Sequence, residues 1–259
     1  MEKRGQITVY IIIAIIIVIS FLILSTAKKQ SVSKLDVGIE NVRIDDTNLR
    51  SFVQFCVDKT AKEAVFYLGF VGGNLKDDIF KKYFHIDSYY RIPYYYYDGT
   101  SLILSEDGFK NLVLAKYMNE NLRKCTNNFK AFENVRIVDS SARTNVELSY
   151  NEAIFNVKYP VSINRVFQIN NLNPEYITEV KVRLKEIIQI AQNIVENEVI
   201  NDRQIHWDYL TDISNKNYNI TAYTESNNTI IYRIIDLENK IDNELYIFQF
   251  ANKIKLKGK

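Results

Sequence analysis

The sequence predicts an α+β protein, in which one N-terminal transmembrane helix precedes a domain of amphipathic helices and an antiparallel sheet. Three observations lead to this prediction. Residues 6–27 contain no charged side chain. Apolar residues recur at helical spacing through most of the chain before residue 128, whereas apolar and polar residues mostly alternate after it, around one long helical segment. Runs of helix followed by runs of strand are typical of α+β folds.

The composition is that of a folded protein that does not bind nucleic acid. The chain has 259 residues, of which 47% are hydrophobic, so it can bury a sizeable core. Its 33 Lys and Arg residues nearly balance 31 Asp and Glu residues, and the formal net charge is only +2. A nucleic-acid-binding domain normally carries a strong basic excess. We therefore expect no nucleic-acid partner.

Residues 6–27 are long and apolar enough to cross a membrane. A helix rises about 1.5 Å per residue, and the hydrocarbon core of a bilayer is about 30 Å thick. The segment is apolar on every face, unlike a helix of a soluble domain. A cleavable secretory signal is the alternative, but its apolar region is normally about 7–15 residues long. We expect a retained helix in contact with membrane lipid. Basic residues on both flanks leave its orientation undecided.

The residues before the apolar segment carry a more specific pattern. The basic pair Lys3-Arg4, followed by Gly5, Gln6 and an immediate apolar helix, is similar to the class III signal peptide of archaeal type IV pilin-like proteins. The resemblance implies that a prepilin-type peptidase removes residues 1–5, by cutting between Gly5 and Gln6 on the cytoplasmic face. It also implies that the C-terminal domain lies outside the cytoplasm, held at the cell membrane by a single span.

The chain departs from pilins in two ways. Tyr10 stands where bacterial pilins carry a glutamate that supports filament packing. Residues 28–41 are polar and include Gly38, so they predict a short tether and not a long amphipathic stem. Both departures weaken the expectation of filament assembly. The rest of the chain resembles membrane-anchored proteins of small-genome archaea, a family without an assigned activity. The residues that carry this likeness are Phe55-Cys56-Val57, Gly72-Gly73, a second cysteine after a helix, and the closing segment 246–251.

Residues 42–128 predict a helical lobe. Its first helix covers residues 48–70, because Asp45-Asp46-Thr47 supplies capping side chains and Gly72-Gly73 is a common helix stop. A second amphipathic helix covers residues 105–125, with Ser105 as its N-cap. Between these helices, tyrosines 94–97, an Asp98-Gly99 turn and residues 101–103 predict a hairpin.

The two cysteines, Cys56 and Cys125, fall on the apolar sides of the two predicted helices. In a domain outside the cytoplasm they are expected to form a disulfide, which would contribute about 4 kcal/mol by closing a long loop. Two buried free thiols are the alternative. We expect no metal site, because the chain has no C-x-x-C motif and only His85 and His206 could complete one.

Residues 129–253 predict an antiparallel sheet lobe with one long helix at residues 174–199, opened by Asn173-Pro174. Residues 254–259 form a basic tail. The predicted strands are 135–138, 145–150, 153–159, 219–223, 229–235 and 245–250.

No catalytic motif stands out. The chain lacks a G-x-S-x-G elbow, a P-loop and an H-E-x-x-H motif. Ser31 and Lys34 have a Ser-x-x-Lys spacing, but they lie in the predicted tether. His206 has no identifiable nucleophile partner, so a structural role is expected. We therefore expect no catalytic residue and no cofactor.

A tyrosine cluster is the feature that best suits a ligand, because tyrosines combine flat apolar faces with hydroxyl groups. If the four consecutive residues form a strand, about half of them face outward, but the strong strand preference of tyrosine favours packing within a sheet. Asn219 and Asn227 each begin an N-glycosylation sequon. The cluster consists of Tyr89, Tyr90, Tyr94, Tyr95, Tyr96 and Tyr97.

The sequence thus favours a non-enzymatic surface protein, pilin-like or adhesin-like, which binds a surface protein or a glycan. The alternative is a membrane-tethered extracytoplasmic enzyme that acts on envelope polymers through residues that the sequence does not identify. A cleft with convergent acids or a histidine-centred site would favour the enzyme, whereas an exposed aromatic ridge would favour binding.

Overall fold

A computed structural model describes residues 46–73, 79–132, 135–165, 168–201 and 204–255. All of these belong to one compact unit, Ile44–Lys259. The leader, the membrane segment and the tether predicted before residue 42 lie outside the described residues, and so do Gly5 and Gln6. Within the described part of the chain, no helix is both long and apolar enough to span a bilayer.

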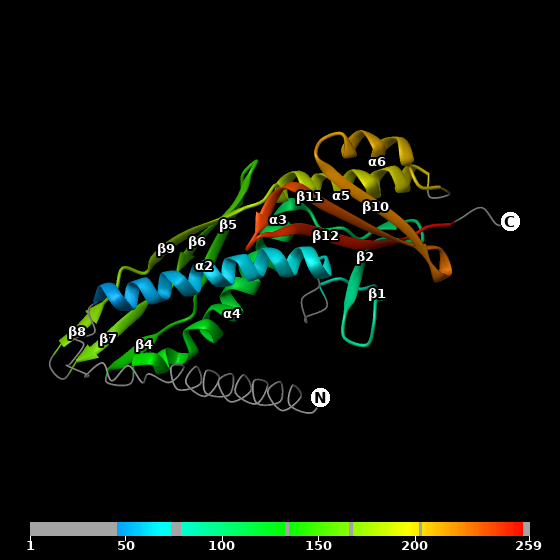
Figure 1. Cartoon of the computed structure of the whole chain (residues 1–259). Coiled ribbons are helices and arrows are strands. Elements are labelled where there is room, and N and C mark those ends of the chain that lie inside the picture. The colour runs from blue at the N-terminus through cyan, green and yellow to red at the C-terminus, as the bar shows by residue number, and fades with distance from the viewer. Residues whose placement is uncertain (1–45, 74–78, 133–134, 166–167, 202–203, 256–259) are drawn as a thin grey trace, which may run out of the picture. The chain divides into compact units, whose positions relative to one another are not determined.

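The unit has an α+β architecture, as the sequence predicts (Figure 1). Its helices are α2 (Asp46–Val71), α3 (Glu106–Gly108), α4 (Lys116–Thr126), α5 (Leu184–Ile200) and α6 (Trp207–Ser214), with a π-helical segment η1 (Phe109–Ala115) and 3-10 segments η2 (Asn127–Phe132) and η3 (Ser226–Asn228). Its strands are β1 (Tyr83–His85), β2 (Arg91–Tyr97), β3 (Thr100–Ser101), β4 (Arg136–Asp139), β5 (Arg143–Leu148), β6 (Glu152–Lys158), β7 (Val161–Arg165), β8 (Gln168–Asn171), β9 (Glu175–Lys181), β10 (Tyr218–Glu225), β11 (Thr229–Ile241) and β12 (Glu244–Lys253).

The strands form three sheets. The largest has the order β1-β2-β12-β11-β10, with β3 paired to β2, and the two smaller ones are β4-β7-β8 and β5-β6-β9. Pairing is antiparallel throughout except between β12 and β2, which run parallel. This parallel pair joins a strand of the predicted helical lobe to the last strand of the predicted sheet lobe, so the two lobes share one sheet.

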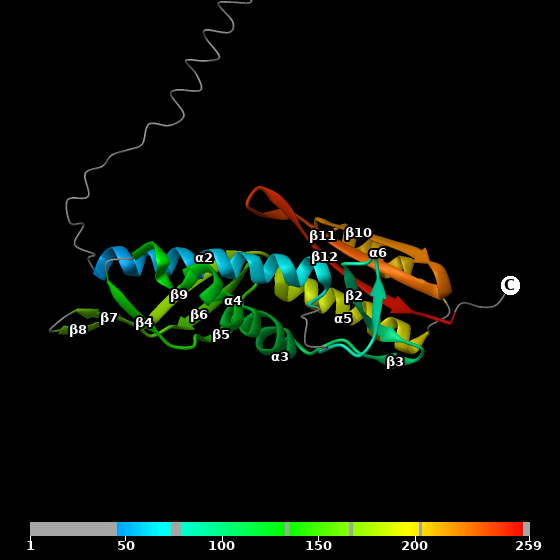
Figure 2. The same ribbon diagram turned by 90° about the horizontal axis from the view of Figure 1, so that it is seen from below.

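Helix α2 contacts α4, β9 and β12 (Figures 1 and 2). At β12 it lies against residues 247–249, next to the stretch 251–253 that pairs with β2. A Cβ atom at Gly69 would overlap the carbonyl oxygen of Ile247, and the Gln249 side-chain amide donates a hydrogen bond to the Phe70 carbonyl. The glycines that end α2 have positive φ, 59° at Gly72 and 75° at Gly73, as a helix stop requires.

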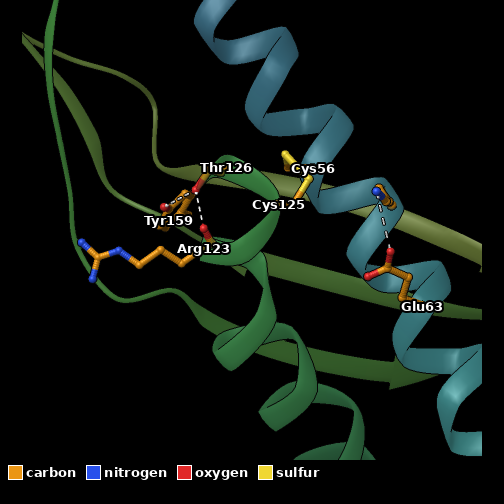
Figure 3. The surroundings of a disulfide bond; sticks show 7 residues. Cys56, Glu63, Arg123, Cys125, Thr126 and Tyr159 are labelled. Atoms are coloured by element: carbon orange, nitrogen blue, oxygen red, sulfur yellow. Dashed lines mark hydrogen bonds and ion pairs between the residues drawn. A yellow bond between two sulfur atoms is a disulfide. The ribbon is translucent and has the colours of Figure 1, made fainter. Parts of the chain in front are cut away.

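The predicted disulfide is present and joins α2 to α4 (Figure 3). The Cα atoms of Cys56 and Cys125 are 5.5 Å apart, within the range that a disulfide needs. The predicted turn at Asp98-Gly99 is also present, with φ of 48° and 97°, and joins β2 to β3. Ser105 caps α3, since its hydroxyl accepts a hydrogen bond from the Gly108 amide at 3.1 Å. These local signals were predicted correctly.

The long helix predicted for residues 174–199 is wrong in its first third. Glu175–Lys181 forms strand β9, and α5 begins only at Leu184. Burial alternates along β9: Tyr176, Thr178 and Val180 are buried, and Ile177 between the first two is 61% exposed. This is a period of two, which a strand paired to β6 requires.

Candidate functional site: an aromatic groove and an exposed hairpin tip

Large apolar side chains are exposed along one side of α2. Phe55 is 61% exposed, Phe66 is 48% exposed and Phe70 is 38% exposed. The opposite side of the helix, which includes Leu49 and Val53, is fully buried. Phe66 and Phe70 are one helical turn apart, and their rings stack with centroids 6.1 Å apart. Helix α2 therefore has two apolar sides, and only one of them is covered by the rest of the described chain.

The exposed side of α2 forms an open groove with the β11–β12 turn, which we call the α2 groove. Its volume is about 700 Å³. Asp242 and Asn243 shape the turn with positive φ, 50° and 72°. The Lys62 ammonium lies 2.6 Å from the Asp242 carboxylate and so connects helix and turn. The lining residues are Phe55, Asp58, Lys59, Lys62, Glu63, Phe66, Ile241, Asp242 and Glu244.

The chemistry of the α2 groove suits a macromolecular partner. Apolar rings stand at Phe55 and Phe66, and charges of both signs lie between and beside them. Small-molecule sites usually bury most of their ligand in a concave pocket, which an open groove on a helix surface does not do. Aromatic residues surrounded by a polar rim are typical of protein interfaces. The ion pair across the groove is exposed, so it contributes at most about 1 kcal/mol to stability.

A second exposed aromatic group lies at residues 86–90, which connect β1 to β2 and which we call the hairpin tip. Tyr89 is 90% exposed, and Ile86 and Tyr90 are each 47% exposed. The Tyr90 ring packs edge-on against Phe70 of α2, with centroids 5.2 Å apart. The tip and the exposed side of α2 are therefore in direct contact.

The hairpin tip is held in one shape by Asp87. One oxygen of the Asp87 carboxylate accepts hydrogen bonds from the backbone amides of Tyr89 and Tyr90, both at 2.7 Å. The Ile86 amide donates to the Tyr90 carbonyl at 2.9 Å. An aspartate that bonds to amides two and three residues ahead stabilises a turn. The exposed side chains thus project from an ordered backbone.

The tyrosines of β2 have the opposite environment. The packing within a sheet that the sequence favours is confirmed for them, and the expectation that about half of them face outward is wrong. Tyr94, Tyr95 and Tyr96 are buried, and Tyr97 is half-buried. β2 lies between β1 and β12, and a second small apolar cluster that includes Ile92 covers its outer face. Only the Tyr89 and Tyr90 part of the predicted cluster is exposed, while Phe66 and Phe70 were not predicted as site residues.

The other residues singled out in the sequence are dispersed. The Nε2 atom of His206 lies 3.0 Å from the carbonyl oxygen of Asn201, in keeping with a structural role. Asn219 is exposed on β10, whereas Asn227 lies in the η3 turn. The Thr229 hydroxyl that completes the Asn227 sequon is buried and lies 2.9 Å from the Tyr94 hydroxyl.

The most buried ion pair joins Arg183 to Asp236. The Arg183 side chain also donates to the carbonyls of Lys216 and Asn217, at 3.3 and 3.2 Å. Burial alone would raise the pKa of Asp236, but hydrogen bonds from Arg183, Asn239 and the backbone, together with the Arg183 charge, hold that pKa below its usual value. These contacts fix the start of α5 against β11, and they suit a structural role.

Glu198 is also a buried carboxylate, and its oxygens accept hydrogen bonds from the Tyr232 hydroxyl at 2.7 Å and the Asn252 amide at 2.6 Å. Burial, followed by the nearby Glu198 charge, raises the pKa of Tyr232 far above its ordinary value. Across the described ranges, no three His, Cys, Asp or Glu side chains are grouped so as to hold a metal ion. The chain matches no protein-family profile, no curated protein and no solved structure.

Proposed function

We propose that the chain is a membrane-anchored extracytoplasmic surface protein that acts by binding a partner and not by catalysis. Residues 6–27 would be the membrane span, and Gly5-Gln6 the processing site. The disulfide between α2 and α4 supports an oxidising location for the domain, since disulfides are rare in the cytoplasm.

The α2 groove is the observation that carries the binding proposal. Monomeric soluble proteins rarely expose a large contiguous apolar surface, and such surfaces usually mark interaction sites. Phe66, Phe70 and Tyr90 form one through direct ring contacts. The mixed charges of the groove favour a protein segment as partner over a glycan, because a protein can offer both apolar and charged side chains.

Two versions of this binding function are possible, and they differ in the partner that the α2 groove contacts. In a pilin-like subunit the groove would contact further copies of the chain, whereas in an adhesin-like protein it would contact another surface protein. Tyr10 and the polar tether favour the adhesin-like arrangement. Mechanical shear distinguishes them: release of the protein as filaments would support the pilin-like arrangement, and retention with the membrane would support the adhesin-like one.

The location is tested by mass spectrometry of the protein purified from its native membrane, with and without reduction. We expect a chain that starts at Gln6 and gains two mass units on reduction of the Cys56–Cys125 bridge. A chain that starts at Met1 and carries two free thiols would contradict both the peptidase processing and the extracytoplasmic location.

A further inference from the structure

The hairpin that ends in this tip, residues 79–97, differs from the α2 groove in the sign of its charges. Residues 79–97 contain three basic side chains, Lys81, Lys82 and Arg91, and a single carboxylate, Asp87. One oxygen of that carboxylate accepts hydrogen bonds from two amides of the tip, and the Asp87 side chain is exposed. Lys81 and Lys82 are exposed. The groove, in contrast, is lined by both acids and bases.

The basic side chains lie beside aromatic rings. The Arg91 guanidinium lies 4.2 Å from the centroid of the Tyr83 ring, and the Lys82 ammonium lies 5.0 Å from that of Tyr97. Such cation–π contacts place the charged groups along the hairpin. The hairpin therefore presents apolar and aromatic groups at its tip, Ile86, Tyr89 and Tyr90, and positive charge behind them. Figure 1 shows it projecting from the rest of the sheet.

We propose that the hairpin tip inserts into the headgroup region of the membrane that anchors the chain, and that it prefers anionic lipid. This inference rests on the membrane-anchor part of the proposed function. Tyrosine is enriched at the membrane interface, where its ring is apolar and its hydroxyl is hydrated. Lysines near a membrane surface are attracted to anionic lipid headgroups. An exposed apolar tip backed by basic residues has both properties.

The length of the chain between the predicted membrane segment and α2 supports lipid as the binding partner of the hairpin tip. The uncharged segment ends at residue 27, and α2 begins at Asp46. At about 3.3–3.6 Å per residue, the intervening chain can extend no further than about 60 Å. The domain therefore stays close to the lipid surface. Because one attachment already confines it, a weak second contact is enough to hold the tip at the membrane.

Docking at the tip would restrict rotation of the domain about its tether. The tip touches α2 through the Tyr90–Phe70 contact, so fixing the tip also fixes the exposed side of α2. A groove with a fixed orientation loses less rotational freedom when a partner binds. The lipid contact would in this way favour the binding that we propose for the α2 groove.

Tryptophan fluorescence can test this inference in the full chain, because the chain contains a single tryptophan, Trp207. A Tyr89→Trp substitution combined with Trp207→Phe places the only tryptophan at the tip. The protein is reconstituted into phosphatidylcholine vesicles, with or without anionic phosphatidylglycerol, whose acyl chains are brominated near the headgroups. We expect blue-shifted emission that is roughly halved by the bromines in the anionic vesicles. Much weaker quenching is expected without anionic lipid.

Two matched controls sharpen the result. In the wild-type chain the tryptophan fluorescence comes from Trp207, which is 56% exposed on α6. We expect no quenching of this emission by the brominated lipids. Adding Lys81→Glu and Lys82→Glu to the tip variant should abolish the quenching, and so should high salt, because both remove attraction to anionic lipid. All substituted side chains are largely exposed, and circular dichroism checks that each variant is folded.

Emission from the tip that stays solvent-like in both vesicles would overturn the inference, and equal quenching in both would overturn the preference for anionic lipid. Vesicle flotation separates this failure from that of the proposed function. Protein that floats with vesicles but shows no quenching is anchored without docking, whereas protein that does not float is not anchored at all.

Discussion

Tyrosines a few residues apart have opposite environments in this molecule. Tyr89 and Tyr90 lie at the hairpin tip, and Tyr89 is 90% exposed. Tyr95 is fully buried, stacks on Phe250 with ring centroids 4.7 Å apart, and donates a hydrogen bond to the Gly72 carbonyl at 3.0 Å. Both groups belong to runs of consecutive tyrosines. Position in the sheet decides whether a tyrosine stabilises the fold or is left exposed for recognition.

The largest difference between the two groups is expected in alkali. Burial is the main cause that raises the pKa of Tyr95, Tyr159, Tyr218, Tyr232 and Tyr246. In the unfolded chain tyrosines ionise near pH 10. The folded state therefore holds these protons more tightly, so stability is retained below about pH 10 and falls as the pH rises further.

We expect the buried tyrosines to ionise together with unfolding, as one cooperative step. Tyrosinate absorbance and circular dichroism, recorded on the same samples at increasing pH, measure the two events. Ionisation of every tyrosine while the circular dichroism stays native would contradict the role assigned to the buried group.

Truncation of one tyrosine from each group gives the next largest contrast. Tyr95→Ala should lower the free energy of unfolding by about 3–5 kcal/mol, because it leaves a cavity and an unpaired carbonyl. Tyr89→Ala should change it by no more than about 0.5 kcal/mol, since an exposed side chain makes few contacts. Denaturant titration of both variants tests this difference. Similar losses in the two variants would refute the division into buried and exposed groups.

The disulfide joins α4 to helix α2, which carries the exposed aromatic side chains Phe55, Phe66 and Phe70. Replacement of Cys56 and Cys125 by alanine should lower the free energy of unfolding by about 2–4 kcal/mol, because the bridge closes a loop between cysteines 69 residues apart. Denaturant unfolding of the oxidised wild type and the double variant measures the loss. An unchanged midpoint would show that α2 and α4 are held together without the bridge.

We expect a substitution in the α2 groove to have the smallest effect on the free energy of unfolding. Lys62→Ala removes an exposed ion pair with Asp242 and should cost at most about 1 kcal/mol. The same change should weaken partner binding, because it removes a charge from the groove. Lys181→Ala is a matched control, since this exposed lysine lies on β9 outside the groove. Thermal unfolding of both variants measures the effect on stability, and binding to a partner identified by crosslinking to the groove measures the effect on recognition.

Local features of the fold could be predicted from the sequence. Helix α2, the Asp98-Gly99 turn and the Cys56–Cys125 pair depend on caps, turn residues and helical spacing that neighbouring residues display. The parallel pairing of β2 with β12 depends on residues far apart in the chain, and no local pattern reveals it. Strand β9 was missed because Asn173-Pro174 resembles a helix start and apolar residues also fit a period of 3.6.

The candidate site was only partly predictable. Tyr89 and Tyr90 belong to the predicted cluster, but the sequence does not show that β2 becomes an inner strand covered on both faces. Phe66 and Phe70 resemble core residues of a helix. A helical projection of α2 would have placed Phe66 and Phe70 on the side away from the buried residues Leu49 and Val53, and so would have indicated a second apolar side.

Site-specific photo-crosslinking in intact cells tests most directly whether the exposed aromatic surface is a binding site. A benzophenone amino acid is placed in the full chain at Phe66, in the α2 groove, and in a separate variant at Tyr150, which is 68% exposed between β5 and β6. We predict one discrete adduct from position 66, with a second copy of the chain or with another surface protein, and none from position 150. No adduct at position 66, or the same adducts at both positions, would contradict the account.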